Sequence, residues 1–183
     1  MSMHPTWHRR RFLMAAAAIL APATPSAFAA LAPPAVRSVL PLYNTHTGER
    51  VTIDYRNADG SYIPDALGAI NHIFRCHFNN EETQMDLATI DFLAAVYSKL
   101  DQPGEIQIIS GFRSKAYNEK LAQQGSGVAK HSLHLIGKAV DIRMPQASLK
   151  AVQEAALQLG LGGVGFYPDS DFVHIDSGRR RFW

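Results

Sequence analysis

Hydrophobic residues recur along most of this chain at two spacings, one typical of helices and the other of strands. Apolar positions three or four residues apart predict helices at residues 63–75, 85–100, 114–124 and 148–159. Short apolar or alternating runs predict strands at residues 36–43, 51–55, 105–109, 138–144, 163–166 and 172–176. This mixture of short elements predicts an α+β fold, in which helices flank a small antiparallel sheet.

The first 29 residues follow a third pattern, that of an export signal. Arginines at positions 9–11 precede Phe12-Leu13 and an apolar run, residues 14–21, that is too short to span a bilayer. A small-x-small site, Ala27-Phe28-Ala29, completes the features of a signal peptide at residues 1–29. A cytoplasmic amphipathic helix and an uncleaved membrane anchor are the alternatives.

The arginine pair with Phe-Leu resembles the twin-arginine type of signal. That resemblance implies the twin-arginine export machinery as a partner and the periplasm as the destination. No stable membrane span is expected after processing. Residues 30–35, which include Pro33-Pro34, predict a linker, and residues 36–183 are long enough for one domain with its own core.

The charge of the chain changes once the signal is set aside. Residues 1–29 hold three of the 18 Lys and Arg residues and none of the 16 Asp and Glu residues, so the remainder has 15 basic and 16 acidic side chains and a net charge of −1. This balance gives no basic field and argues against nucleic acid as a partner. The cluster Arg179-Arg180-Arg181 is interpreted as a solvated tail.

Cys76 is the one cysteine of the chain, so no intramolecular disulfide can form. Its apolar surroundings in the sequence favour a buried filler of the core. A metal pair of Cys76 with the adjacent His77 is the alternative.

Two histidines and an aspartate provide the candidate chemistry. His134 precedes the predicted strand 138–144, Asp141 lies on it, and His174 lies on the predicted strand 172–176. Because alternate residues of a strand share a face, Asp141 and His174 are polar side chains on the face opposite the apolar one. Imidazole nitrogen and carboxylate oxygen are ligands that catalytic Zn²⁺ uses, with water at its fourth position. The spacing therefore predicts a zinc site at His134, Asp141 and His174, with Gly137 allowing a close turn between the first two.

The motif Ser132-x-His134-x-x-Gly137-x-Ala139-x-Asp141 resembles the signature of the zinc D-Ala-D-Ala peptidases, the superfamily that includes lysostaphin and hedgehog domains. A longer resemblance is to its murein endopeptidase K-like branch. The matching segments are residues 42–49, 109–114, 162–168 and 172–176. This family resemblance implies a hedgehog/D,D-peptidase-like fold, zinc as the cofactor and peptidoglycan cross-links as the substrate. It also implies that His134, Asp141 and His174 are the metal ligands.

Arg113 follows the predicted strand 105–109 in the motif Ser110-Gly111-Phe112-Arg113. Amide hydrolysis develops an oxyanion, which a fixed cation stabilises. Related enzymes have an arginine in this motif near the scissile carbonyl, so the resemblance implies a catalytic role for Arg113. A structural salt bridge is the alternative.

Three residues are candidates for the general base. The relatives often have a carboxylate three residues before the last histidine, and Asp171 fills that position. Such a carboxylate would take a proton from water and pass it to the leaving amine. Ideal alternation puts Asp171 on the face opposite His174, so this role requires a bend at the strand entry. Asp176 shares the face of His174 and is expected either as the base or as a partner that orients an imidazole; His131 is the third candidate.

These observations leave three functions open. The first is a periplasmic zinc murein endopeptidase or carboxypeptidase, and the second is a non-catalytic, zinc-bearing cell-wall binding module. The third is a zinc amidohydrolase acting on another small amide. Arg113, together with a carboxylate near His174, favours chemistry over binding alone.

Overall fold

Seven strands in the described part of the chain form one mixed sheet. The computed structural model describes Met1 and residues 38–101, 104–125, 129 and 131–183, so the predicted signal peptide and linker lie, apart from Met1, outside the described residues. The strand order is β2-β1-β3-β4-β6-β5-β7. The strands are β1 (Val39–Asn44), β2 (Arg50–Asp54), β3 (Ile106–Ser110), β4 (Ala139–Arg143), β5 (Gly163–Tyr167), β6 (Phe172–Asp176) and β7 (Arg181–Phe182).

Four α-helices accompany the sheet in these residues, as the periodicity predicts. They are α1 (Pro64–Ile73), α2 (Leu87–Lys99), α3 (Lys115–Gln123) and α4 (Leu149–Leu159). Ser114 and Ser148 begin α3 and α4, since each side chain accepts a hydrogen bond from a backbone N–H of the first turn. Two short 3-10 helices, η1 (Leu133–Ile136) and η2 (Pro168–Ser170), were not predicted.

The prediction of an α+β fold is confirmed, but the sheet is larger than predicted and is not purely antiparallel. β1 runs parallel to β3, and β5 runs parallel to β7. Parallel neighbours need a long crossover connection, and the segment with α1 and α2 provides it between β1 and β3. β7 escaped prediction because two residues are too few to show a period.

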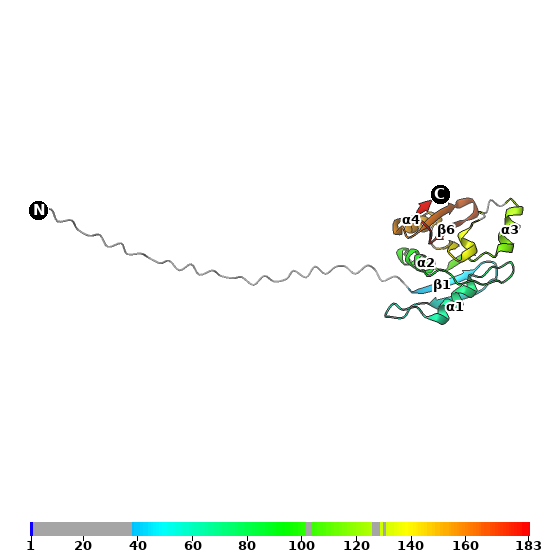
Figure 1. Ribbon diagram of the computed structural model, residues 1–183, viewed down its shortest axis with the longest axis horizontal. Helices are drawn as coiled ribbons and strands as arrows, with labels where there is room; N and C mark the ends of the chain where they lie inside the picture. The colour runs from blue at the N-terminus through cyan, green and yellow to red at the C-terminus, as the bar shows by residue number, and fades with distance from the viewer. Residues whose placement is uncertain (2–37, 102–103, 126–128, 130) are drawn as a thin grey trace. The chain divides into compact units, whose positions relative to one another are not determined.

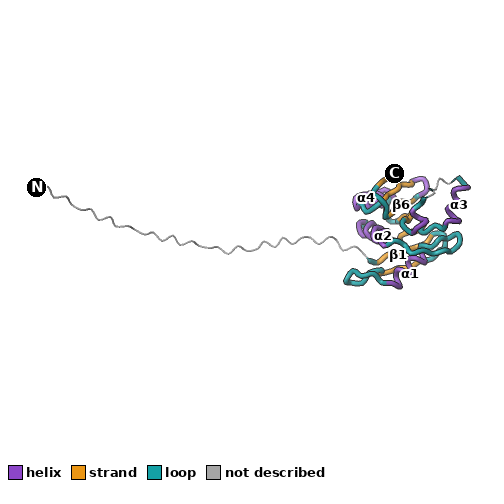
Figure 2. The backbone as a smooth tube through the Cα atoms, viewed as in Figure 1, coloured by secondary structure: helices purple, strands orange, loops and turns teal. Residues whose placement is uncertain are grey.

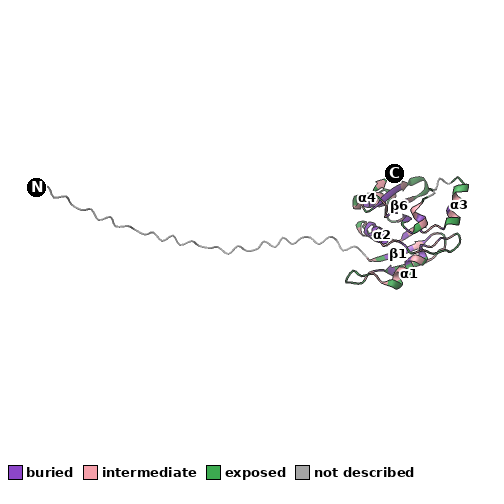
Figure 3. Cartoon of the chain, in the orientation of Figure 1, coloured by how far each residue is buried: buried purple, intermediate pink, exposed green. Residues whose placement is uncertain are grey.

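One face of the sheet is covered by helices and forms the core. α1 contacts β1 and β2, whereas α2 and α4 contact each other and β6. Figure 1 shows α2 between α1 and α4, and Figure 2 shows α3 apart from these three helices. Val140 and Ile142 of β4 and Val173 and Ile175 of β6 belong to this core. Figure 3 shows the buried residues concentrated in α2 and the central strands. The alternate residues of β4 and β6, which include Asp141 and His174, therefore lie on the other face.

Cys76 is 1 % exposed, and its thiol donates to Ser114 Oγ at 3.4 Å, which confirms the buried position. His77 stacks on His46. Among the described residues, neither Cys76 nor His77 belongs to the group of side chains that could hold a metal ion. None of the described helices is long and apolar enough to cross a membrane.

Candidate metal centre and cavity

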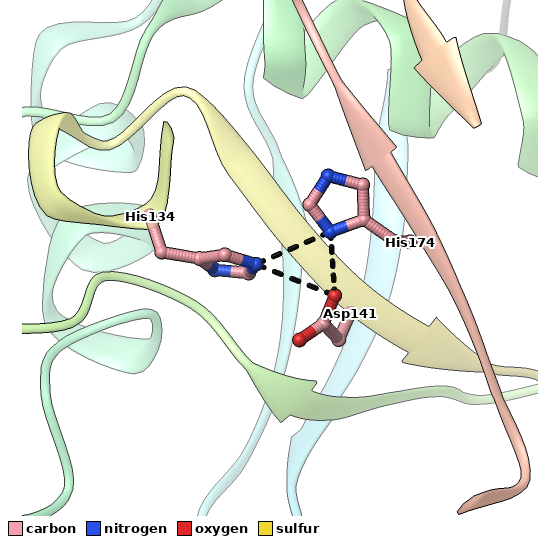
Figure 4. Close-up of side chains that lie close together, drawn as sticks. All are labelled: His134, Asp141 and His174. Carbon is pink, nitrogen blue, oxygen red and sulfur yellow. Dashed lines mark hydrogen bonds and ion pairs between the residues drawn. The ribbon is translucent and has the colours of Figure 1, made fainter. Parts of the chain in front are cut away.

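His134, Asp141 and His174 converge on one point of the structure (Figure 4). His134 lies on η1, while Asp141 and His174 are direct cross-strand partners on β4 and β6. Nδ1 of His174 lies 2.8 Å from Oδ1 of Asp141, and Nε2 of His134 lies 3.3 Å from the same oxygen. The two imidazole nitrogens are 3.2 Å apart.

These separations fit a tetrahedral metal ion. Ligand atoms bound to zinc at about 2.0–2.1 Å lie roughly 3.3 Å from one another. Two imidazole nitrogens and one carboxylate oxygen are also a donor set that zinc accepts. Among the described residues, this is the one group of three His, Cys, Asp or Glu side chains close enough to hold an ion. The structure therefore brings together the three predicted ligands in an arrangement that suits a metal.

Backbone contacts fix the orientation of His134. Its Nδ1 lies 2.7 Å from the carbonyl oxygen of Gly111, so the ring donates there and presents Nε2 to the other two ligands. Gly137 ends η1 with φ +67°, and a Cβ there would lie 2.8 Å from the carbonyl oxygen of Gln84. The predicted close turn at this glycine is thus required both by conformation and by space.

Asp176 fixes the orientation of His174 from the side away from the other ligands. Its Oδ2 lies 3.0 Å from Nε2 of His174, which leaves Nδ1 facing Asp141. Arg181 of β7 binds both carboxylate oxygens, at 2.9 and 2.7 Å, and the N–H of Gly178 donates at 2.8 Å. Asp176 is completely buried and contacts the imidazole, an arrangement that suits a partner that orients the ring. The interpretation of Arg179-Arg180-Arg181 as a solvated tail is wrong for Arg181.

Burial and hydrogen bonding oppose each other in setting the charges of this group. Burial disfavours the ionised form of Asp141, but the contacts with His134 and His174 outweigh it and hold its pKa below the ordinary range. Burial also lowers the pKa of His174, yet hydrogen bonds to Asp141 and Asp176 raise it to about 9. For Asp176, burial is outweighed by the contacts with His174 and Arg181, and its pKa falls to about 2. The metal-free group therefore holds two carboxylates and a protonated imidazole at neutral pH, and metal binding must displace a proton.

The three ligands line a cavity of about 370 Å³ that also contains Arg113 and His131. The backbone N–H of Arg113 donates to the carbonyl oxygen of His134, and its Nη1 lies 3.4 Å from Oδ1 of Asn118. Its Nε is buried and has no hydrogen-bond partner among the described residues. The guanidinium therefore lies at the wall of the cavity that contains the metal ligands, with Nη1 beside Asn118.

Asp171 is not brought into this cavity. It has φ +53° at the entry to β6, and its carboxylate pairs with Arg143 at 2.8 Å. Its side chain is 64 % exposed and lines a separate cavity of about 530 Å³ with Gln107 and Arg143. The predicted bend is present, but it directs the carboxylate toward Arg143. Of the three candidates for the general base, His131 alone lines the metal cavity.

Three aromatic residues of this cavity were missed by sequence reasoning. Tyr167, Phe172 and Trp183 line it on the side of β5 and β7. They come from separate segments, so no local motif connects them. The one available signal is Gly165, whose missing side chain leaves room for the Trp183 ring.

Comparison with known proteins gives a consistent result over nearly the whole chain. The sequence profile of a family described as peptidoglycan L,D-endopeptidase MepK matches residues 32–183. The chain is 40 % identical over 157 residues to the peptidoglycan L,D-endopeptidase MepK of Escherichia coli K12, covering 86 % of this chain and 85 % of that protein. It is 35 % identical over 146 residues to a probable peptidoglycan L,D-endopeptidase MepK of Haemophilus influenzae, covering 79 % and 78 % of the two chains.

Proposed function

Because this chain belongs to the peptidoglycan L,D-endopeptidase MepK family, we propose that it is a zinc-dependent peptidase that hydrolyses peptide cross-links of peptidoglycan. The names of its relatives further suggest an L,D bond as the one that is cut. The single observation that carries the proposal is the convergence of His134, Asp141 and His174 in a cavity that also holds Arg113.

Each residue of the site has a separate role in the proposed hydrolysis. His134, Asp141 and His174 would hold the zinc ion, which supplies Lewis-acid chemistry and lowers the pKa of a water molecule toward neutrality. Arg113 donates hydrogen bonds to the oxygen of the scissile carbonyl as negative charge develops there. His131, at the wall of the same cavity, takes the proton from the attacking water and returns it to the leaving amine. Asp176 and Arg181 keep the His174 imidazole in place.

The proposal includes the site of action. The leader at residues 1–29 supports export by the twin-arginine route to the periplasm, where peptidoglycan is accessible. The proposed partners are therefore cross-linked muropeptides and the twin-arginine export machinery.

The test is digestion of purified sacculi with zinc-loaded protein, followed by chromatography and mass analysis of the released muropeptides. We expect cross-linked species to fall and uncross-linked species to rise with zinc, and not after chelation. A His174→Ala variant is the matched control and should be inactive and low in zinc. A zinc-loaded wild type that binds sacculi but releases nothing would refute the enzyme and favour the non-catalytic binding module.

A further inference from the structure

Three aromatic rings form a continuous wall on one side of the metal cavity. Tyr167 of β5 and Phe172 of β6 are cross-strand partners whose ring centroids are 4.6 Å apart and nearly parallel. The indole Nε1–H of Trp183 donates to the hydroxyl oxygen of Tyr167 at 2.6 Å. We call Tyr167, Phe172 and Trp183 the aromatic wall; all three line the same cavity as the metal ligands.

Trp183 is held beside the metal site by the backbone of β5. Its N–H donates to the carbonyl oxygen of Val164, and its carbonyl accepts from the N–H of Phe166. A Cβ at Gly165 would lie 2.8 Å from two carbons of the indole ring, so the ring occupies the space that a side chain at this position would fill. Gly165 is the cross-strand partner of His174, and the indole centroid lies 5.3 Å from that of His174.

The wall retains accessible apolar surface although it is fixed in place. Trp183 is 47 % exposed and Tyr167 is 37 % exposed. The indole N–H donates to the Tyr167 hydroxyl oxygen, and Arg181 is bound to Asp176. Arg181 also lines the cavity and its guanidinium lies 4.8 Å from the centroid of the Trp183 ring, but its charge is balanced by the ion pair with Asp176. The surface on this side is therefore mainly aromatic, which suits aliphatic groups and planar amides.

The strand order separates the wall from Arg113. Arg113 follows β3, Asp141 and His174 lie on β4 and β6, and Trp183 lies over β5. From β3 to β5 the sheet order β3-β4-β6-β5 spans three strand spacings, roughly 14 Å at about 4.8 Å each. That is the length of about four extended residues. A peptide crossing this cavity thus has the scissile group near the metal ligands, Arg113 on one side and the wall on the other.

We propose that Tyr167, Phe172 and Trp183 form a subsite that binds an uncharged, aliphatic residue of the peptide substrate on one side of the scissile bond, with Trp183 as the residue that determines its fit. This inference rests on the proposed peptidase function. It assigns Trp183 a part in substrate binding and none in bond cleavage.

Kinetics on soluble cross-linked muropeptides, released from sacculi by a muramidase, test the subsite. Trp183→Ala and Gly165→Ala remove or displace the indole by different means, and Phe182→Ala is the control because Phe182 is 77 % exposed and is not among the residues that line this cavity. We expect KM to rise about 10-fold in the first two variants, the scale for losing one well-packed aromatic contact, with kcat within about twofold of wild type. Trp183→Phe should recover part of the KM, and Phe182→Ala should match wild type. Unchanged KM in both Trp183→Ala and Gly165→Ala would overturn the subsite while leaving the peptidase intact.

A binding measurement separates the subsite from the catalytic proposal. The chain has two tryptophans, Trp7 and Trp183, so a full-length Trp7→Phe protein reports on Trp183 alone. With zinc removed to prevent turnover, added muropeptides should change its emission saturably. A saturable change in a protein that proves inactive with zinc would support the subsite and refute the peptidase. No change at concentrations well above the wild-type KM would overturn the subsite. Because this measurement keeps Trp183 and is made without zinc, it also tests the subsite if the Trp183→Ala variant loses zinc.

Discussion

Asp176 and His174 lie two residues apart on β6, and the carboxylate of the first meets Nε2 of the second at 3.0 Å. This contact leaves Nδ1 of His174 as the nitrogen that faces Asp141, 2.8 Å away. Arg181 reaches from β7 to hold both oxygens of Asp176. The orientation of His174 thus depends on an ion pair in which Asp176 is buried and Arg181 lines the edge of the same cavity.

Replacing Asp176 by Asn should weaken zinc binding by about 10- to 100-fold, the usual effect of losing a partner that orients a ligand imidazole. The measurement is competition for zinc against a chelator of known affinity. Asp169→Asn, an exposed change in η2, is the control and should bind zinc normally. Wild-type zinc affinity in a folded Asp176→Asn protein would contradict the positioning role.

Replacing Arg113 by Ala should retain zinc but reduce kcat by about 10²- to 10³-fold, as expected when one donor to a developing oxyanion is removed. Zinc content and turnover on muropeptides are measured on the same preparation. Asn118→Ala, which removes the side chain beside the guanidinium, should produce a smaller loss of the same kind. Full activity in Arg113→Ala would eliminate the oxyanion role.

His131 and Asp171 make opposite predictions for the general base. Because His131 lines the metal cavity and Asp171 pairs with Arg143 elsewhere, His131→Ala should lower kcat by about 10²- to 10⁴-fold. Asp171→Asn should stay within a few-fold of wild type. The reverse pattern would mean that the loop before β6 rearranges during catalysis and that Asp171 is the base.

The metal-free protein should lose stability as the pH rises from about 6.5 to 9. Burial lowers the pKa of His174, but its bonds to Asp141 and Asp176 raise it to about 9, whereas an unfolded histidine titrates near 6.5. The stabilisation is complete below the unfolded pKa and disappears as the pH passes through the folded one. The free energy of unfolding in urea should fall by roughly 3 kcal/mol at most over this range. A flat profile without metal would exclude a charged His174, and His174→Gln is the variant in which the slope should vanish.

Replacing Arg9, Arg10 and Arg11 together by Lys should leave the precursor in the cytoplasm if the leader is of the twin-arginine type. Changing all three avoids a partial basic pair that Arg11 would otherwise re-create. Cell fractionation and immunoblotting give the answer. Normal processing of the triple variant would indicate the general secretion route.

The sequence by itself determined most of the local elements and the grouping of three candidate metal ligands. Helices and strands were predicted within a few residues because their signals, apolar spacing and the capping serines Ser114 and Ser148, are local. His134 and Asp141 lie in one short motif. His174 lies in a strand where apolar and polar residues alternate, and this alternation shows which face of the sheet its side chain is on. These three side chains could therefore be grouped before any contact was known.

Only the tertiary structure decided which distant segments meet. The parallel pairing of β1 with β3 and of β5 with β7 depends on contacts between segments far apart in the chain. Asp171 itself has φ +53°, which turns its carboxylate toward Arg143, and no pattern in the sequence specifies that angle. The same dependence on strand pairing brings Arg181 to Asp176 and Trp183 over Gly165, because a two-residue strand carries too little periodicity to reveal its partner.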